Sequence, residues 1–487
     1  MSGENDLSNK MLSAAKWSSI TEIAAKLVSP ISNMILARLL VPEAFGVVAT
    51  VTMIVSFADM FTDAGFQKYL IQHSFKTEED KFKSANVAFW TNFSISILLW
   101  LIILFNSDQI AVLVGNPGLG GVIAVASFQL PVTSFSSVQM ALYRRDFDFK
   151  TLFLVRLVSI FLPFIITIPL AIIGMSYWSL IVGVIFAQLA NAIILTFKSK
   201  WKPKLYFDLG ILKRMFSFSF WSLVEAVSIW FTLWIDTFII SSTFSQYYLG
   251  LYKTSISMGN SMMALITSAT VPIIFSALSR LQDDDEQFRN VFLKFQRVVS
   301  VIIFPLGVGV YLYSDIVTQI LLGDQWVDAS GVIGLWALTS ALVIIFGHYC
   351  SEVYRAKGNP KLSFLAQILH LVVLVPTCIF ASKFGFWALV YARSWIRMEA
   401  ILVHFVLMKF IVGITAFRII KNLTPTIIST IIMALTGYVL SEMYTGVIWS
   451  FISIVICALV YFGVLFLFPC MKNEVISIFI RMIRRSK

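Results

Sequence analysis

The chain has 487 residues, of which 58% are hydrophobic, 15% aromatic and only 13% charged. Soluble domains are about 45–50% apolar and about 25% charged, so this composition excludes a cytosolic enzyme, a disordered protein and a secreted disulfide scaffold. A net charge of +11 would suggest nucleic acid in a soluble protein. In a membrane protein the position of the charges matters more, and we expect no nucleic-acid partner.

Apolar segments long enough to cross a bilayer recur along the whole chain. They are continuously apolar, whereas barrel strands alternate between two faces, so they predict helices. The expected fold is an all-α integral membrane protein with fourteen transmembrane helices, at residues 17–38, 43–70, 84–106, 119–142, 150–173, 176–197, 215–241, 246–277, 291–313, 331–354, 362–382, 386–409, 425–443 and 446–469.

The basic residues give an independent check on this number of spans. With the N-terminus in the cytoplasm, thirty of the 37 lysines and arginines fall in cytoplasmic segments or at their edges, and only Arg38 and Lys383 fall outside. Both termini are therefore predicted to be cytoplasmic. The longest outside loop, about 314–330, carries three aspartates and no basic residue.

The two halves of the chain resemble each other. Trp17 and Gly46 match Trp221 and Gly250 at an offset of 204 residues, and two later matches follow in the same order at offsets of 211 and 209. These matches pair spans 1–6 with spans 7–12. Because six is even, both halves begin on the same side, which predicts a parallel repeat: two six-helix lobes around a central cavity.

A C-terminal helical hairpin remains outside the repeat. The predicted division of the chain is a cytoplasmic N-terminal tail (1–16), an N-lobe (17–197), a cytoplasmic inter-lobe loop (198–214), a C-lobe (215–410), a cytoplasmic linker (411–424), the hairpin (425–469) and a basic cytoplasmic tail (470–487).

Polar side chains recur at helical spacing within several spans. Charges there are costly, at about 2.5–3.5 kcal/mol each on insertion scales, so they usually face a cavity or a partner. The acidic residues are Glu22, Asp59, Asp63, Glu225, Asp236 and Glu399; the basic ones are Lys26, Arg156, Lys253, Arg393 and Arg397. One interpretation is structural pairing, for example between Glu22 and Lys26. The alternative is a shared water-filled cavity, in which basic groups without a local acidic partner bind an anion: Arg156, Lys253, Arg393 and Arg397.

The segment ILARLLVPEAFG at residues 35–46, followed by DAGF at 63–66, resembles the Wzx-type polysaccharide flippases. These belong to the multidrug/oligosaccharidyl-lipid/polysaccharide exporter superfamily. The resemblance covers spans 1–12. It implies that the chain is a transporter and not an enzyme. It also implies that undecaprenyl-diphosphate-linked oligosaccharide units move from the cytoplasmic to the periplasmic leaflet of the bacterial inner membrane by alternating access.

The resemblance also implies roles for the charged residues. Basic groups in the cavity would bind the anionic headgroup, and the candidates are Lys26, Arg38, Arg156, Lys253, Arg393 and Arg397. Acidic groups would couple transport to a proton or sodium ion, and the candidates are Glu22, Asp59, Asp63, Glu225 and Asp236. Expected partners are the lipid-linked oligosaccharide, membrane lipids and the polysaccharide polymerase machinery.

Two other functions remain open. An ion-coupled small-molecule or multidrug antiporter of the same superfamily would share the fold, and the charges within the spans do not decide against it. A membrane-bound glycan polymerase or ligase usually has a large periplasmic loop with basic and histidine residues, which this sequence lacks. Nucleotide-binding and zinc-binding motifs are also missing from the sequence, so we expect no cofactor and no metal.

Overall fold

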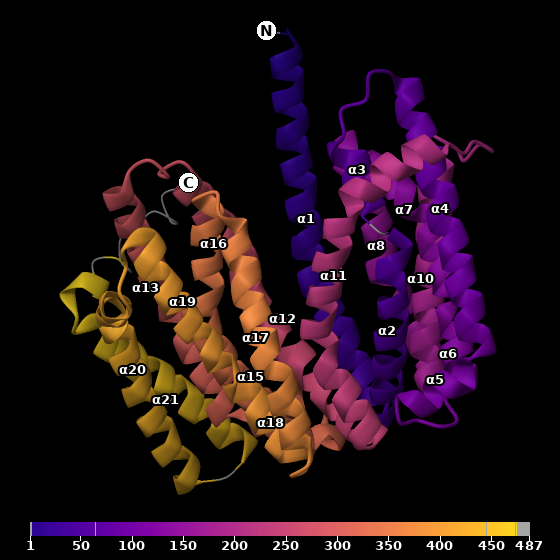
Figure 1. Cartoon of the computed structure of the whole chain (residues 1–487). Coiled ribbons are helices and arrows are strands. Elements are labelled where there is room, and N and C mark those ends of the chain that lie inside the picture. Colours follow the sequence, from indigo (N-terminus) through magenta and orange to yellow (C-terminus); the bar gives the residue numbers. More distant parts are fainter. Residues whose placement is uncertain (1, 64, 445, 473, 475–487) are drawn as a thin grey trace. The chain divides into compact units, whose positions relative to one another are not determined.

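The computed structural model describes residues 2–63, 65–444, 446–472 and 474 (Figure 1). Helices make up nearly all of these ranges, and no strand occurs within them. Thirteen helical segments of the described chain are long and apolar enough to cross a membrane. The chain is therefore an all-helical, multi-pass membrane protein, as its composition predicts.

The chain forms two compact units, Met1–Lys253 and Thr254–Lys487. The boundary between them lies within one helix, α12. The first unit contains α1 (Ser2–Leu39), α2 (Pro42–Asp63), α3 (Phe66–Gln72), α4 (Glu78–Phe105), α5 (Ser107–Leu113), α6 (Gly120–Ser127), α7 (Gln129–Arg145), α8 (Phe149–Ile165), α9 (Thr167–Ile172), α10 (Tyr177–Lys198), α11 (Leu209–Thr243) and the start of α12 (Gln246–Ser279).

The second unit continues α12. Its other elements are α13 (Asp285–Leu312), α14 (Ser314–Leu321), the 3₁₀ segment η1 (Asp324–Ala329), α15 (Ser330–Val343), the π-helical turn η2 (Ile344–His348), α16 (Tyr349–Ala356), α17 (Pro360–Ser382), α18 (Phe386–Trp395), α19 (Arg397–Val412), α20 (Ala416–Met443) and α21 (Val447–Phe466).

Helices extend into several segments that the sequence analysis places outside the membrane. Helix α1 begins at Ser2, so residues 2–16 of the predicted tail continue the first helix, whose candidate membrane span begins at Lys16. Helix α20 begins at Ala416, inside the predicted linker 411–424. Most of the predicted tail 470–487 lies outside the described residues. Helix α11 packs against α2, α3 and α4 within the first unit, while the division into lobes at 198–214 stays a prediction.

The predicted span 43–70 is wrong as a single helix. Helix α2 ends at Asp63, and α3 begins at Phe66 after Gly65, whose φ of 79° is left-handed. Glycine adopts this conformation without the steric cost that a side chain would add. The chain therefore turns there, and the buried Phe66 packs with Tyr69 and Phe89 in the core of the first unit.

The predicted span 386–409 is also divided, into α18 and α19. The amide of Glu399 donates to the carbonyl oxygen of Ile396 at 3.0 Å, a three-residue closure that tightens the helix at this point. Every 18-residue stretch of 386–412 carries at least three charged residues, drawn from Arg393, Arg397, Glu399 and Lys409. This charge content explains why thirteen apolar crossing segments, and not fourteen, are found among the described residues.

The C-terminal hairpin of α20 and α21 packs along α13, and Figure 1 shows α20 and α21 side by side. The Tyr461 hydroxyl donates to the carbonyl oxygen of Val301 at 2.9 Å. The hydroxyl groups of Ser300 and Thr426 lie 3.0 Å apart. These buried hydrogen bonds attach the hairpin firmly to the second unit, because a buried polar group left without a partner would be costly in a membrane.

Candidate transport site

Lys253 lies over an aromatic ring in the first unit. Its Nζ is 4.3 Å from the centre of the Trp234 ring and 3.5 Å from the carbonyl oxygen of Leu233. A cation over an indole face is attracted to the negative charge of the π-system. The half-buried ammonium of Lys253 is thereby held against α11.

Asp236, a candidate for ion coupling, is buried in the same part of the first unit. Its carboxylate accepts a hydrogen bond from the Tyr252 hydroxyl at 2.7 Å and another from the Thr237 backbone amide at 2.7 Å. A buried carboxylate needs such donors. Asp236 therefore joins α11 to α12 in addition to any role in ion coupling.

Asp59 and Glu225 have different surroundings. The Asp59 carboxylate accepts from the hydroxyls of Thr62 at 3.1 Å and Thr133 at 3.2 Å, which joins α2 to α7. Glu225 forms an ion pair with Lys68 at 3.2 Å, in which both side chains are more than half exposed. Such an exposed pair contributes at most about 1 kcal/mol in water. The side chain of Asp63 lies outside the described residues.

The remaining candidates of the first unit lie on α1 and α8, which pack together. Arg38 is exposed in the last turn of α1, and Lys26 is half-buried further back along that helix. Glu22 and Arg156 are exposed. Among the described residues, no ion pair involves Glu22, Lys26 or Arg156. The structure therefore does not show the pairing of Glu22 with Lys26 that one interpretation of the sequence offers.

In the second unit, two predicted arginines meet on one tryptophan. The guanidinium carbon of Arg397 is 4.1 Å from the centre of the Trp336 ring, and that of Arg393 is 5.3 Å away. Arg397 also donates to the Ser340 hydroxyl at 3.0 Å, and Arg393 is buried. We call Arg393, Arg397, Trp336 and Ser340 the arginine–tryptophan cluster.

The sequence analysis missed Trp336, which organises this cluster. The Trp336 indole nitrogen donates to the side-chain oxygen of Asn260 at 2.9 Å, which fixes the orientation of the ring. One signal was available: Trp336, Thr339 and Ser340 follow helical spacing within the predicted span 331–354, so they lie on one face. Arg397 contacts all three of these residues.

Gly46 and Gly250, matched by the internal repeat, pack against each other's helices in the first unit. A Cβ atom on Gly46 would collide with the carbonyl oxygen of Gln246, and one on Gly250 with that of Pro42. Gln246 lies four residues before Gly250, and Pro42 lies four residues before Gly46. Each glycine therefore faces the backbone carbonyl that lies one helical turn before the other glycine. Small residues allow membrane helices to approach closely, so α2 and α12 cross here backbone to backbone.

Hydrogen bonds surround this glycine crossing. The Thr50 hydroxyl lies 3.1 Å from that of Ser241 and 3.2 Å from the side-chain oxygen of Gln246. Asn116, in the loop after α5, donates to the Ser241 carbonyl at 3.0 Å. The loops that meet here precede α2, follow α5 and follow α11, and the charge pattern predicts all three on the outer side of the membrane.

An apolar groove lies in the second unit along α13 and the C-terminal hairpin. It encloses about 390 Å³ and is lined mainly by aliphatic and aromatic side chains, among them Leu306, Val310, Ile454 and Phe462. Tyr313 also lines it, and the Tyr313 hydroxyl contacts the Cys457 sulfur at 3.4 Å. The groove is suited to a hydrocarbon chain, because it offers apolar surface with few polar groups.

The fold is similar to those of two solved membrane transporters. The structure is similar to "Lipid II flippase MurJ, inward closed conformation", with a TM-score of 0.75 and 16% identity, over 94% of this chain and 99% of that one. It is also similar to an inward-facing multidrug resistance MATE family transporter of the superfamily, with a TM-score of 0.62 and 13% identity, over 81% of this chain and 98% of that one.

A family model described as "Polysaccharide biosynthesis protein" matches residues 35–331. The chain belongs to this family of polysaccharide biosynthesis proteins. Among its relatives, lipopolysaccharide biosynthesis protein WzxC of Escherichia coli (strain K12) is 21% identical over 84% of this chain and 82% of that protein. The succinoglycan biosynthesis transport protein ExoT of Rhizobium meliloti (strain 1021) is 23% identical over 67% of this chain and 65% of that protein.

Proposed function

We propose that this transporter moves undecaprenyl-diphosphate-linked oligosaccharide units from the cytoplasmic to the periplasmic leaflet of a bacterial inner membrane, by alternating access of its two lobes. The observation that carries the proposal is the arginine–tryptophan cluster. Two guanidinium groups lie on one indole within a membrane protein. Arginine is suited to binding phosphate because its planar fork donates two parallel hydrogen bonds.

The chemistry of the substrate fits the other features of the site. Its sugar diphosphate is too polar for the hydrocarbon core and needs a path lined with polar groups. Its polyprenyl tail can stay in lipid or in an apolar groove such as the one along α13 and α21. With about two negative charges, the headgroup would be driven outward by a negative-inside potential, at about 2.3 kcal/mol per charge per 100 mV.

In this proposal the basic residues act at successive stages. Arg393 and Arg397 bind the diphosphate on the second unit, and Lys253 and Lys26 attract it on the first. Arg156 and Arg38 are exposed and would meet the headgroup only at the ends of its path. Asp59 is the best-placed acidic residue for proton or sodium coupling, because its partners Thr62 and Thr133 are hydroxyls. A hydroxyl can donate to the ionised carboxylate and accept from the protonated carboxyl group.

The glycine crossing of α2 and α12 is proposed to form part of the closed outer gate. The helices touch there through backbone atoms and a few neutral hydrogen bonds. Each such bond has a net value of about 0.5–1.5 kcal/mol, so this contact can separate and re-form during transport. Both termini would lie in the cytoplasm, and polymerase machinery would receive the units on the outer side.

We expect deletion of the gene to stop output of the surface polysaccharide, while lipid-linked units accumulate in the cytoplasmic leaflet. Leaflet distribution can be measured with a sugar-binding probe added to sealed vesicles of known orientation. A plasmid copy of the gene should restore both polymer and distribution. A deletion strain with lipid-linked units distributed as in the parent would contradict the proposal.

A further inference from the structure

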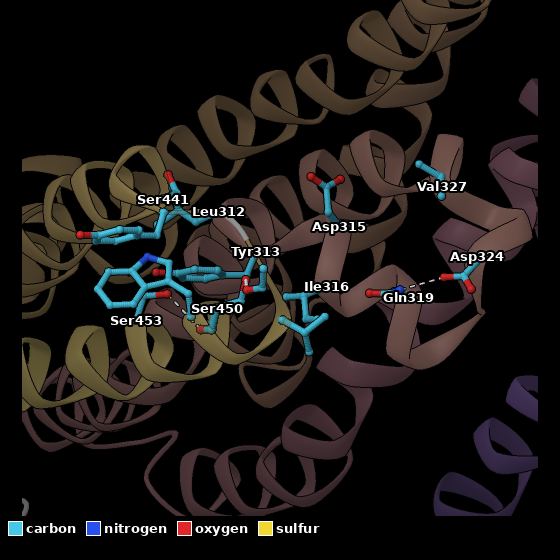
Figure 2. A pocket seen from close by; sticks show the side chains of 14 residues that line it. Leu312, Tyr313, Asp315, Ile316, Gln319, Asp324, Val327, Ser441, Ser450 and Ser453 are labelled. Atoms are coloured by element: carbon cyan, nitrogen blue, oxygen red, sulfur yellow. Dashed lines mark hydrogen bonds between the residues drawn. The ribbon is translucent and has the colours of Figure 1, made fainter.

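A second pocket lies where two outer segments of the second unit meet. Figure 2 shows side chains of α14 and η1, such as Ile316 and Asp324, together with side chains of α20 and α21, such as Ser441 and Ser450. Its volume is about 400 Å³, within the range of small-molecule sites, which is about 300–1,000 Å³. The charge pattern predicts the loop at 314–330 and the turn near 445 on the same side of the membrane, so we call this the outer pocket.

Aromatic rings form one end of the outer pocket. Tyr313, Tyr444 and Trp449 line it, and the rings of Tyr444 and Trp449 lie 5.1 Å apart at 68°. The Trp449 indole nitrogen donates to the Leu440 carbonyl oxygen at 2.7 Å, which fixes the orientation of the ring. A rigid ring of this kind offers an apolar face on which a flat ligand can stack.

Acidic and amide groups form the other end. Gln319 donates to the Asp324 carboxylate at 2.8 Å, and Figure 2 shows this pair apart from the hydroxyls of Ser450 and Ser453. The carboxylate of Asp315 is exposed and makes no hydrogen bond or ion pair with any residue that the structure describes. No lysine or arginine lines the pocket in this part of the chain.

This combination determines which ligands the outer pocket can accept. Carboxylates accept hydrogen bonds from hydroxyl and ammonium groups, and aromatic faces attract cations and apolar ring faces. Anions are disfavoured, since the charged side chains among the described lining residues, Asp315 and Asp324, are both negative. A single hydrated metal ion would leave most of the volume empty, and the described residues contain no group of three metal-ligating side chains.

We propose that the outer pocket binds a neutral or amino-substituted sugar ring, stacked on Trp449 and hydrogen-bonded to Asp315. The pocket adjoins the apolar groove, because Leu312 and Tyr313 line both. A lipid-linked glycan with its chain in the groove would therefore bring its sugars to the outer pocket. Binding of a sugar ring is independent of the proposed function, whereas assigning it to the transported glycan rests on that function.

The test uses the full chain in phosphatidylglycerol nanodiscs, since maltoside detergents would themselves supply sugars. Saturation-transfer NMR would compare glucosamine, N-acetylglucosamine and glucuronate. We expect the first two to bind, and glucuronate to bind at least about tenfold more weakly. Trp449→Ala should abolish binding of all the sugars. Asp315→Asn should weaken the binding of glucosamine by about tenfold. It should weaken the binding of N-acetylglucosamine less, because only glucosamine carries a positive charge.

The matched control is Glu442→Gln, which removes an exposed carboxylate at the same end of α20 that does not line the pocket. The proposal would be overturned if Asp315→Asn and Trp449→Ala bound the sugars as well as Glu442→Gln does. It would also be overturned if the wild-type chain bound glucuronate and glucosamine equally well. Displacement of the sugars by phosphatidylethanolamine would assign the pocket to a lipid amine instead. Sugar binding by a chain that fails to flip a lipid-linked glycan would refute only the proposed function.

Discussion

Gly250→Val is expected to reduce polysaccharide export to less than about a tenth of the wild-type level. The Gly250 backbone lies directly against the Pro42 carbonyl, and the Cβ that any other residue carries would collide with it. Overpacking of a close contact typically costs about 1–3 kcal/mol, and here the clash is with backbone that cannot rotate away. Helices α2 and α12 would be held apart at the crossing, so the outer gate would not close.

The control for this substitution is Gly121→Ala. Gly121 lies in α6, also near a predicted outer loop, and an added Cβ there meets no atom within 4 Å. Export by Gly121→Ala should equal that of the wild type. Gly46→Val should reproduce the loss, because its Cβ would meet the Gln246 carbonyl in the same way. Normal export by Gly250→Val at normal protein levels would show that the glycine crossing is not needed for transport.

Arg397→Ala is expected to lower export by at least about tenfold without loss of the folded protein. The substitution removes a guanidinium that lies over Trp336 and donates to Ser340. A tenfold loss corresponds to about 1.4 kcal/mol, close to the lower limit of about 1.5 kcal/mol for one hydrogen bond to a charged group. Arg397→Lys should restore only part of the activity, since an ammonium keeps the charge but lacks the planar fork.

Two measurements separate binding from stability for Arg397. The thermal unfolding temperature of the purified variant should remain close to that of the wild type. Its affinity for a lipid diphosphate should fall by about the same factor as export does. Arg280→Ala, which removes an exposed arginine in the second unit, serves as the control and should change neither quantity. Unchanged affinity of Arg397→Ala for the lipid diphosphate would remove this residue from the headgroup site.

Hydropathy predicted the class of fold because a long apolar segment has few alternatives to a helix in a membrane. It could not predict where helices break. Gly65 and the turn at Ile396 depend on local backbone geometry, which the average hydropathy of a segment does not record. The internal repeat matched Gly46 with Gly250 in the sequence, but only the structure shows that their helices pack together at these glycines.

The candidate site was predicted in part for a similar reason. Charges within apolar spans stand out in a sequence, so Arg393 and Arg397 were found. Trp336 was not found, because a tryptophan in an apolar helix is indistinguishable from a packing residue until its contacts are known. Asp236 shows the converse: its hydrogen bond to Tyr252 gives the carboxylate a structural role that spacing alone did not indicate.

Reconstitution of the purified chain into liposomes with a defined undecaprenyl-diphosphate-linked oligosaccharide tests the central claim most directly. Transfer of the glycan between leaflets can be followed by its access to an external glycosidase, with and without a membrane potential or an ion gradient. We expect the glycan to be transferred only when the protein is present, and transfer to be lost in Gly250→Val. Transfer should be faster when the membrane potential drives anions in the direction of transfer. Transfer no faster than in protein-free liposomes under every gradient would contradict the account.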